Sequence, residues 1–402
     1  MTIEPIISLA PSIERIKASP TSTMNKHLRA LQASGRDIVG LNIGEPDLPT
    51  PAHVRRAAIE AIEGGATKYT NVDGAPALKE AIVAKLRREN GLAYDTEEIV
   101  VSTGAKQVIF QGILASVSVG DEVIIPTPCW VSYPDIVALC GGTVRLIAPE
   151  KGFHLPIEGI RNHIGSRTKW IILNNPCNPS GITYSREELL SLAEVMRSHP
   201  QVLLLEDDIY EHMLYDGRAF LTLPNVAPDL QYRVLVVNGV SKAYSMTGWR
   251  IGYGAAHKKL IAAIVKLQSQ ATSCASSVSQ AAARAALEGG FECVREMCAI
   301  FESRRNLVSR ELRDIPGLEF QEPQGTFYFF VNCRALLGRR TNVGTLIDTD
   351  EALALHLLDN GVAVVAGTAF LASPYFRISF AAADASLIEG CRRIRAAVSK
   401  LI

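Results

Sequence analysis

Short β-branched runs alternate with helical patterns from about residue 51 to residue 256, and this alternation constrains the fold more than any other feature of the sequence. Such alternation is typical of βαβ units around a mostly parallel sheet. Several runs are apolar on both faces, as expected for strands that lie between two layers of helices. Ser185 and Glu188 predict a capped helix start between two of the strands. We therefore predict an α/β fold with strands near residues 99–102, 123–125, 143–147, 170–173, 202–205, 234–238 and 251–254.

The pattern changes after about residue 288. A long charged helix is predicted over residues 291–313, and the tail combines strands at 327–331, 362–365 and 376–379 with helices near 350–358 and 384–398. A chain of 402 residues is expected to hold two or three units, and residues 1–48 are too few for a domain. We predict that residues 49–290 form a large domain and residues 291–402 a small α+β domain, which residues 1–48 join.

Composition excludes several classes of partner. The chain carries 41 Lys and Arg against 41 Asp and Glu, so it lacks the basic surplus that favours nucleic acid. No apolar stretch approaches the roughly 20 residues that span a bilayer, and residues 1–16 do not resemble a signal peptide. The 8 cysteines are scattered without a CxxC pair, which indicates reduced, mostly buried cysteines and no metal site. We expect a cytoplasmic protein with neither nucleic-acid nor membrane partners.

The usual motifs of nucleotide, dinucleotide, zinc-protease and serine-hydrolase sites are absent from the sequence. Residues 234–254 instead read VLVVNGVSKAYSMTGWRIGYG, so an apolar strand runs into Ser241 and Lys242 and is followed by Arg250. Burial at a strand end lowers the pKa of a lysine, and a Schiff-base lysine needs a neutral amine to attack a carbonyl. The alternative is an ordinary surface lysine.

Residues 202–215, VLLLEDDIYEHMLY, place three acids and a tyrosine after another apolar strand. A carboxylate such as Asp207 can hold a protonated ring nitrogen, and the phenol of Tyr210 can bond a ring oxygen. Mg²⁺ ligation and a solvated turn are the alternatives for this acidic cluster.

Two further turns follow predicted strands. Residues 170–181, WIILNNPCNPSG, end in a proline-stiffened loop that presents Asn178, either to position an amide or as a merely structural turn. Residues 101–107, VSTGAKQ, lead through a small-residue turn into a helix whose first N–H groups would form an anion site. Open α/β sheets bind ligands at their strand ends, so we expect a ligand there.

These four segments, in this order and spacing, resemble those of the class I, fold-type I pyridoxal-phosphate aminotransferases. GEPD at residues 44–47, TKYT at 67–70, CWVSYP at 129–134 and FRIS at 376–379 extend the resemblance over nearly the whole chain. It is strongest to the bacterial aspartate aminotransferases of the subgroup that includes prephenate aminotransferases. The resemblance implies a large domain with a mostly parallel seven-stranded sheet between helices, a smaller α+β domain, pyridoxal phosphate as cofactor, and a homodimer with shared active sites.

The resemblance also implies roles for individual residues. Lys242 would bind the cofactor covalently, Asp207 would bond its ring nitrogen, and Trp130 would stack on its ring. Tyr210 and Asn178 would bond the ring hydroxyl oxygen. The phosphate would be held by Gly104, Ala105, Lys106, Ser241 and Arg250, and by Tyr69 of the neighbouring subunit.

Arg377 matches the arginine that clamps the substrate α-carboxylate. Thr21 and Lys106 match positions that contact the distal carboxylate of a dicarboxylic substrate, although a lysine at a helix start can also face solvent. The remaining substrate contacts implied by the resemblance are Gly44, Trp130 and Asn178. The implied reaction is ping-pong transfer of an amino group between an L-amino acid, such as aspartate, and a 2-oxo acid, such as 2-oxoglutarate.

Cys129, Ala105 and Ser245 depart from the family pattern, which keeps an aromatic or specialised aminotransferase as an alternative, together with a lyase or decarboxylase on the same fold. A non-catalytic sensor of this fold would need an N-terminal DNA-binding module, for which residues 1–48 leave no room. Cys129 beside Trp130 is a candidate determinant of substrate preference. We expect the neutral total charge to hide a cationic pocket formed by Lys106, Lys242, Arg250 and Arg377.

Overall fold

The computed structural model describes residues 7–149 and 151–402, apart from the side chains of residues 21 and 151. Its largest sheet contains β2 (Ile99–Ser102), β3 (Glu122–Pro126), β4 (Thr143–Ile147), β5 (Thr168–Asn174), β6 (Leu203–Asp207), β7 (Val234–Gly239) and β8 (Gly252–Ala255). The strand order is β2-β8-β7-β6-β5-β3-β4, and all neighbours are parallel except that β8 is antiparallel to both β2 and β7. The predicted α/β fold with a mostly parallel seven-stranded sheet is confirmed.

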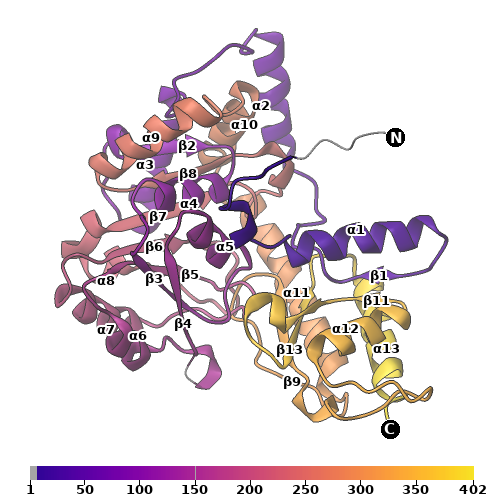
Figure 1. Cartoon of the computed structure of the whole chain (residues 1–402). Coiled ribbons are helices and arrows are strands. Elements are labelled where there is room, and N and C mark those ends of the chain that lie inside the picture. Colours follow the sequence, from indigo (N-terminus) through magenta and orange to yellow (C-terminus); the bar gives the residue numbers. More distant parts are fainter. Residues whose placement is uncertain (1–6, 150) are drawn as a thin grey trace, which may run out of the picture.

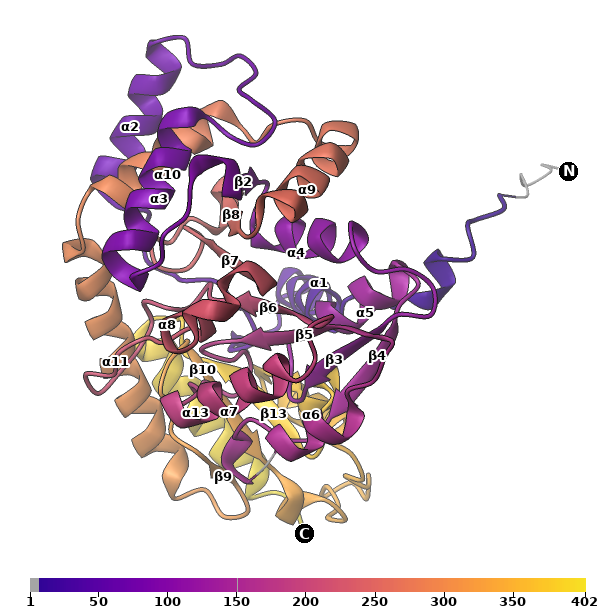
Figure 2. The same cartoon turned by 90° about the vertical axis from the view of Figure 1, so that its left-hand side faces the viewer.

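Helices cover both faces of this sheet (Figures 1 and 2). One face packs against α4 (Ala105–Leu114), α5 (Ser132–Leu139) and α9 (Lys258–Ala271). The other packs against α3 (Pro76–Asn90), α6 (Ile157–His163), α7 (Arg186–Arg197), α8 (Leu223–Val226) and α10 (Ser277–Glu288), with α2 (Ala52–Glu63) against α10. Within β5, Trp170 and Ile172 face the first layer while Ile171 and Leu173 face the second, which explains why this strand is apolar on both faces.

The predicted start of α7 is confirmed in detail. Ser185 accepts a hydrogen bond from the backbone N–H of Glu188, and the Glu188 side chain accepts one from the N–H of Ser185. This reciprocal cap satisfies donors that the first helical turn leaves free. Leu189, Leu192 and Met196 then follow at helical spacing and are fully buried against the sheet.

The rest of the chain forms two small sheets with helices beside them. β1 (Val39–Gly40) pairs with β11 (Val362–Ala363), and an antiparallel sheet has the order β12-β13-β10-β9. The strands of that sheet are β9 (Glu319–Phe320), β10 (Tyr328–Asn332), β12 (Val365–Ala366) and β13 (Tyr375–Ser379). The helices are α1 (Pro20–Ala33), α11 (Glu292–Arg313), α12 (Asp350–Asp359) and α13 (Asp384–Val398).

The single strand predicted over residues 362–365 is wrong. The run divides at Val364 into β11 and β12, which belong to different sheets. β11 takes β1 as its partner, and β12 takes β13. A local apolar run cannot reveal this division, because the choice of partner depends on residues far away in the sequence.

The N-terminal helix lies beside the C-terminal part of the chain (Figure 1). Leu28 and Ile38 form a small apolar cluster with Leu358 and Ala363. The domain limits at residues 48 and 290 stay a prediction. Among the described residues, no helix combines the length and the apolar composition required to cross a bilayer.

Candidate active site

A cavity of about 370 Å³ lies at the carboxyl ends of β5, β6 and β7. Because these strands are parallel, the residues that follow them meet at one edge of the sheet, and β13 and the segment after β1 close the opposite side. Most of the residues singled out in the sequence line this cavity: Gly44, Ala105, Lys106, Trp130, Asn178, Asp207, Tyr210, Ser241, Lys242, Arg250 and Arg377.

Lys242 follows β7 and lies at the centre of the cavity wall. Its Nζ donates a hydrogen bond to the carbonyl oxygen of Gly44 at 2.8 Å, and the rings of Tyr210 and Phe327 lie 5.8 Å away. Burial lowers the pKa of Lys242 to about 8, against the opposing effect of Glu45. The lysine therefore supplies a neutral amine near neutral pH far more readily than an ordinary surface lysine does.

Asp207 ends β6 and is the only one of the three consecutive acids that lines the cavity. Burial raises the pKa of Asp207 to about 6, although Tyr133 donates a hydrogen bond to its Oδ2 at 2.6 Å. Glu206 points elsewhere and accepts hydrogen bonds from Thr222 and from the backbone N–H of Leu223. Glu206, Asp207 and Asp208 are all buried, so they do not form a solvated turn. Among the described residues the three carboxylates do not gather around one possible metal position.

Asn178 and Tyr210 flank this carboxylate. Asn174 fixes the loop after β5, because its Nδ2 donates to the carbonyl oxygen of Asp207 and its Oδ1 accepts from the backbone N–H of Asn178, both at 2.7 Å. The hydroxyl of Tyr210 lies 3.0 Å from that of Tyr328. Both Asn178 and Tyr210 are buried, so each presents a polar group in a fixed place at the cavity.

The start of α4 forms one end of the cavity. Gly104 precedes the helix with φ 95°, and a Cβ there would collide with the Nη2 of Arg250. Arg250 donates to the carbonyl oxygens of Thr247 at 2.8 Å and Thr103 at 3.3 Å, which holds its guanidinium beside the helix. A helix N-terminus and a guanidinium are both positive, so this end of the cavity can bind an anion such as phosphate.

Arg377 projects from β13 at the opposite side and is 3% exposed. Its Nη1 donates to Oδ1 of Asn178 at 3.0 Å and its Nη2 to the carbonyl oxygen of Asn42 at 2.9 Å. Its buried Nε has no hydrogen-bond partner among residues 7–149 and 151–402. The guanidinium lies over the rings of Tyr328 and Phe370, at 4.2 and 4.9 Å. It is therefore oriented as a planar receptor for a carboxylate.

Lys106 lies in the first turn of α4, with its Nζ 4.7 Å from the centre of the Trp130 ring. Burial lowers the pKa of Lys106, and the charge of Arg250 lowers it further. Lys106 is exposed by its accessible surface, but it lines the cavity beside Trp130. Trp130 itself is held edge-to-face by Tyr133, with ring centroids 5.2 Å apart.

Three of the singled-out residues do not line the cavity, and the side chain of a fourth is not described. Gly104 lies beneath Arg250, whereas Tyr69 is 90% exposed. Thr21 belongs to α1, but its side chain is outside the described part. Cys129 is buried in the core beside α4 and α5 rather than lining the cavity, so it does not contact a substrate directly.

Several residues of the site were not identified from the sequence: Asn25, Asn42, Glu45 and Tyr328 line the cavity, and Tyr133 contacts Asp207 without lining it. Glu45 and Tyr133 stand inside the GEPD and CWVSYP segments, which were the only available signal. Tyr328 belongs to a predicted strand of the C-terminal part, and its place beside Gly44 and Tyr210 depends on tertiary packing.

The charges of the cavity do not balance. Lys106, Lys242, Arg250 and Arg377 face it, against the acids Asp207 and Glu45. None of the four cations forms an ion pair with any described residue, and the expected cationic pocket is therefore present. Arg377 is buried and Lys242 is half-buried, whereas Lys106 and Arg250 are exposed. An unpaired cation inside a protein is costly unless a ligand supplies the negative charge.

A sequence profile of the family described as aminotransferase class I and II matches residues 36–394. The chain belongs to this family. The aspartate aminotransferase of Rhizobium meliloti (strain 1021) is 49% identical over 395 residues, which cover 98% of this chain and 96% of that one. The probable aspartate/prephenate aminotransferase of Rickettsia bellii (strain RML369-C) is 48% identical over 396 residues, covering 98% and 99%.

Solved structures give the same result. A crystal structure of the aspartate aminotransferase from Rhizobium meliloti has a TM-score of 0.96 at 48% identity, covering 98% of this chain and 100% of that one. The Thermus thermophilus aspartate aminotransferase with maleate has a TM-score of 0.90 at 36% identity, with the same coverage. The protein is an aminotransferase, and the cavity lies where its fold brings the family motifs together.

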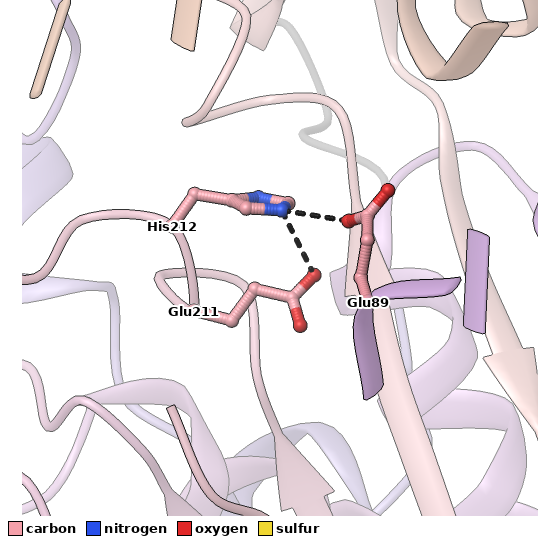
Figure 3. A group of neighbouring side chains, drawn as sticks. All are labelled: Glu89, Glu211 and His212. Atoms are coloured by element: carbon pink, nitrogen blue, oxygen red, sulfur yellow. Dashed lines mark hydrogen bonds and ion pairs between the residues drawn. The ribbon is translucent and has the colours of Figure 1, made fainter. Parts of the chain in front are cut away.

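A second charged cluster lies apart from this aminotransferase site. His212 Nε2 is 2.9 Å from Oε2 of Glu89 and 3.7 Å from Oε1 of Glu211 (Figure 3). These three residues have the composition of a metal site. The ammonium of Lys85 also contacts Glu211 and lies 3.5 Å from Glu89, so the acids already have a cation.

Proposed function

We propose that this aminotransferase uses pyridoxal phosphate to transfer the amino group of a dicarboxylic L-amino acid, with aspartate as the principal donor, to a 2-oxo acid such as 2-oxoglutarate. The observation that carries the proposal is the set of four unpaired cations around one cavity. A phosphate and the two carboxylates of a dicarboxylic substrate together supply the missing negative charge.

The residues present fit the cofactor. The absence of a Cβ at Gly104 leaves room for Arg250 against the start of α4, and with Ser241 and Lys106 this end suits the phosphate. Asp207 would accept a hydrogen bond from a protonated ring nitrogen, and Tyr210 and Asn178 would donate to the ring hydroxyl oxygen. Trp130 would stack on the face of the ring. When bound, pyridoxal phosphate supplies an electron sink for the pair of electrons left at the substrate Cα.

The chain's own residues supply binding and proton transfer. Lys242 would hold the cofactor covalently through its neutral amine, and, when released from it by the substrate, would take the proton from the substrate Cα as a general base and return it as a general acid. Arg377 holds the α-carboxylate, with its unpartnered Nε available for that group. Donor and acceptor use the same arginine, so the donor leaves as an oxo acid before the acceptor enters.

Lys106 supports a dicarboxylic substrate. It faces the cavity from α4, whereas Arg377 faces it from β13, and among the described residues Lys106 forms no ion pair with an acid. The Thermus thermophilus relative was solved with maleate, which is a dicarboxylate, and the two relatives named above carry aspartate or aspartate/prephenate in their names.

We also propose a cytoplasmic homodimer with shared active sites, in which Tyr69 contacts the cofactor phosphate of the partner. Tyr69 is 90% exposed, although it belongs to a motif of the family. A tyrosine with this exposure is available to a second subunit.

Single half-reactions test the substrate proposal. Each amino acid of a panel that includes aspartate, glutamate, alanine and phenylalanine is mixed with the holoenzyme, and the released oxo acid and the amino group retained on the cofactor are measured. We expect equal amounts of the two products, and the highest rate constant with aspartate. Release of ammonia or CO₂ in place of retained nitrogen would contradict transamination.

Lys106→Ala sharpens the same test. We expect kcat/KM for aspartate to fall about 10–100-fold, because a charge-assisted hydrogen bond is lost, while alanine changes little. Arg377→Lys is the matched control and should lower kcat/KM for all amino acids alike. If Lys106→Ala leaves the ratio of aspartate to alanine unchanged, the dicarboxylic assignment is wrong.

A further inference from the structure

We propose that Tyr133 is a positioning residue that keeps Asp207 ionised, so that Asp207 can hold the proton on the ring nitrogen of the cofactor. The inference rests on the proposed function for its catalytic meaning, but the contact between the two side chains exists without any ligand. Tyr133 does not line the cavity and acts only through Asp207.

The geometry allows Tyr133 little freedom. It lies in α5, is 1% exposed, and donates from its hydroxyl to Oδ2 of Asp207 at 2.6 Å. Trp130, which lines the cavity, packs against the Tyr133 ring with the two ring planes inclined at 81°. Tyr133 therefore contacts both Trp130 and the Asp207 carboxylate. A hydrogen bond of this length to a carboxylate belongs to the strong, charge-assisted class.

The direction of the hydrogen bond follows from burial. Burial raises the pKa of Tyr133 well above its usual range, and the charge of Asp207 raises it further, so the hydroxyl keeps its proton and remains a donor. A hydroxyl donor stabilises the carboxylate form of Asp207 over the carboxylic acid. The hydroxyl thus opposes the effect of burial on Asp207.

Other groups around Asp207 cannot replace this contact. The backbone N–H of Ile209 donates to Oδ1 at 3.4 Å, which is long. Lys242 lowers the pKa of Asp207 through its charge and not through a hydrogen bond. Cys177, Tyr210 and the neighbouring Asp208 are further titratable groups that interact with Asp207 in the described part of the chain. Without the Tyr133 hydroxyl, the pKa of Asp207 would rise above about 6, and more of the carboxyl would carry its own proton.

Tyr133→Phe removes the hydroxyl and keeps the ring, and the cofactor-free protein provides the first readout. A carboxyl whose pKa is raised in the folded state destabilises the protein as pH rises through that pKa. The destabilisation is larger in the variant, so the difference in unfolding midpoint between wild type and Tyr133→Phe should widen from pH 4 to pH 8. A difference that is constant with pH would overturn the proposal.

Tyr215→Phe is the matched control. Tyr215 is also fully buried, but its hydroxyl donates to the backbone carbonyl of Thr326, which does not titrate. Its effect on the midpoint should not vary with pH. In an Asp207→Asn background, Tyr133→Phe should also lose its pH-dependent effect, and persistence of that effect there would contradict the coupling.

The second readout is affinity for pyridoxal phosphate, measured by equilibrium titration of the cofactor-free protein. We expect Tyr133→Phe to weaken binding about 10–100-fold at pH 8 and less at lower pH, as for a lost hydrogen bond to a charged group. Unchanged affinity at pH 8 would overturn the role toward the cofactor. If wild type itself binds no pyridoxal phosphate, the proposed function fails, whereas the pH-dependent unfolding still tests the link between Tyr133 and Asp207.

Discussion

The loop of residues 207–212 contributes to two charged regions that are built in opposite ways. On one side, Asp207 and Tyr210 face a cavity in which four cations form no ion pair with any acid in the part of the chain that the structure describes. On the other, Glu211 enters a buried cluster in which every charge is compensated. The two regions are separated by a single turn of the chain, and they differ in how their charges are paired.

The compensated cluster joins three elements. Lys85 of α3 is fully buried and contacts Glu211, and it donates to Oδ1 of Asn90 at 2.7 Å. Glu211 also accepts hydrogen bonds from Asn90 at 2.6 Å and from Asn238 of β7 at 2.8 Å. Burial alone would raise the pKa of Glu211, but Lys85, His212 and these hydrogen bonds lower it to about 2.

The comparison shows how to distinguish charges that hold a fold from charges that await a ligand. A buried ion pair with all its hydrogen bonds made stabilises an arrangement against loss of either partner. Unpaired cations that converge on a cavity instead favour the binding of an anion, and they destabilise the ligand-free protein. The paired charges around Glu211 fix the loop after β6, and this loop places Asp207 and Tyr210 at the cavity with the unpaired cations.

Removing the central unpaired cation should give the largest effect. We expect Lys242→Ala to lower the transamination rate by at least about 10³-fold, because general acid–base catalysis at Cα is lost. The absorbance of covalently bound cofactor should vanish, while the unfolding midpoint of the cofactor-free protein should not fall, since no ion pair is broken. Lys266→Ala, on the exposed side of α9, is the control. An active, yellow Lys242→Ala variant would contradict the assignment.

Breaking the compensated cluster should affect stability next. Glu211→Gln leaves Lys85 buried without its nearest acid, and we expect the free energy of unfolding at neutral pH to fall by about 3 kcal/mol. Chemical denaturation measures this change. The double variant Lys85→Met with Glu211→Gln should recover part of the lost free energy of unfolding. If Glu211→Gln alone is as stable as the wild type, the cluster is not compensated as described.

The pH dependence of the cluster has a defined sign. Because the pKa of Glu211 is lowered to about 2, its contribution is complete at neutral pH and is lost as pH falls from about 4 toward 2. Glu211→Gln should therefore flatten this part of the stability profile, and an identical acid limb in both proteins would contradict the interpretation.

The smallest expected effect concerns Glu45, which faces the cavity, accepts a hydrogen bond from Thr247 and is exposed. Glu45→Gln should lower the pKa of Lys242 below about 8, since Glu45 opposes the effect of burial there. We expect KM for amino acids to rise about 2–5-fold, because the substrate ammonium loses a nearby acid. Oxo acids carry no ammonium and serve as the internal control. An equal rise in KM for oxo acids would exclude this role.

Much of the fold could be predicted because local signals agree with tertiary structure. The strand predicted at residues 143–147 and the helix at 384–398 coincide with β4 and α13. Lys242, Asp207 and Asn178 could be found because each follows an apolar strand, and parallel strands bring their ends together. Tyr133 and Tyr328 could not be found, since neither position carries a chemical signal apart from its contact across the fold.

By itself, the sequence determined the layered α/β architecture, the family, and the residue types that meet at the strand ends, because apolar periodicity and motif spacing are local properties of the chain. Only the tertiary structure decided that Asp207 faces the cavity while Glu206 and Glu211 face other partners. It also decided which cations stay unpaired. The physical reason is that ion pairing and burial depend on contacts between elements distant in sequence, and these contacts set the charge that remains for a ligand.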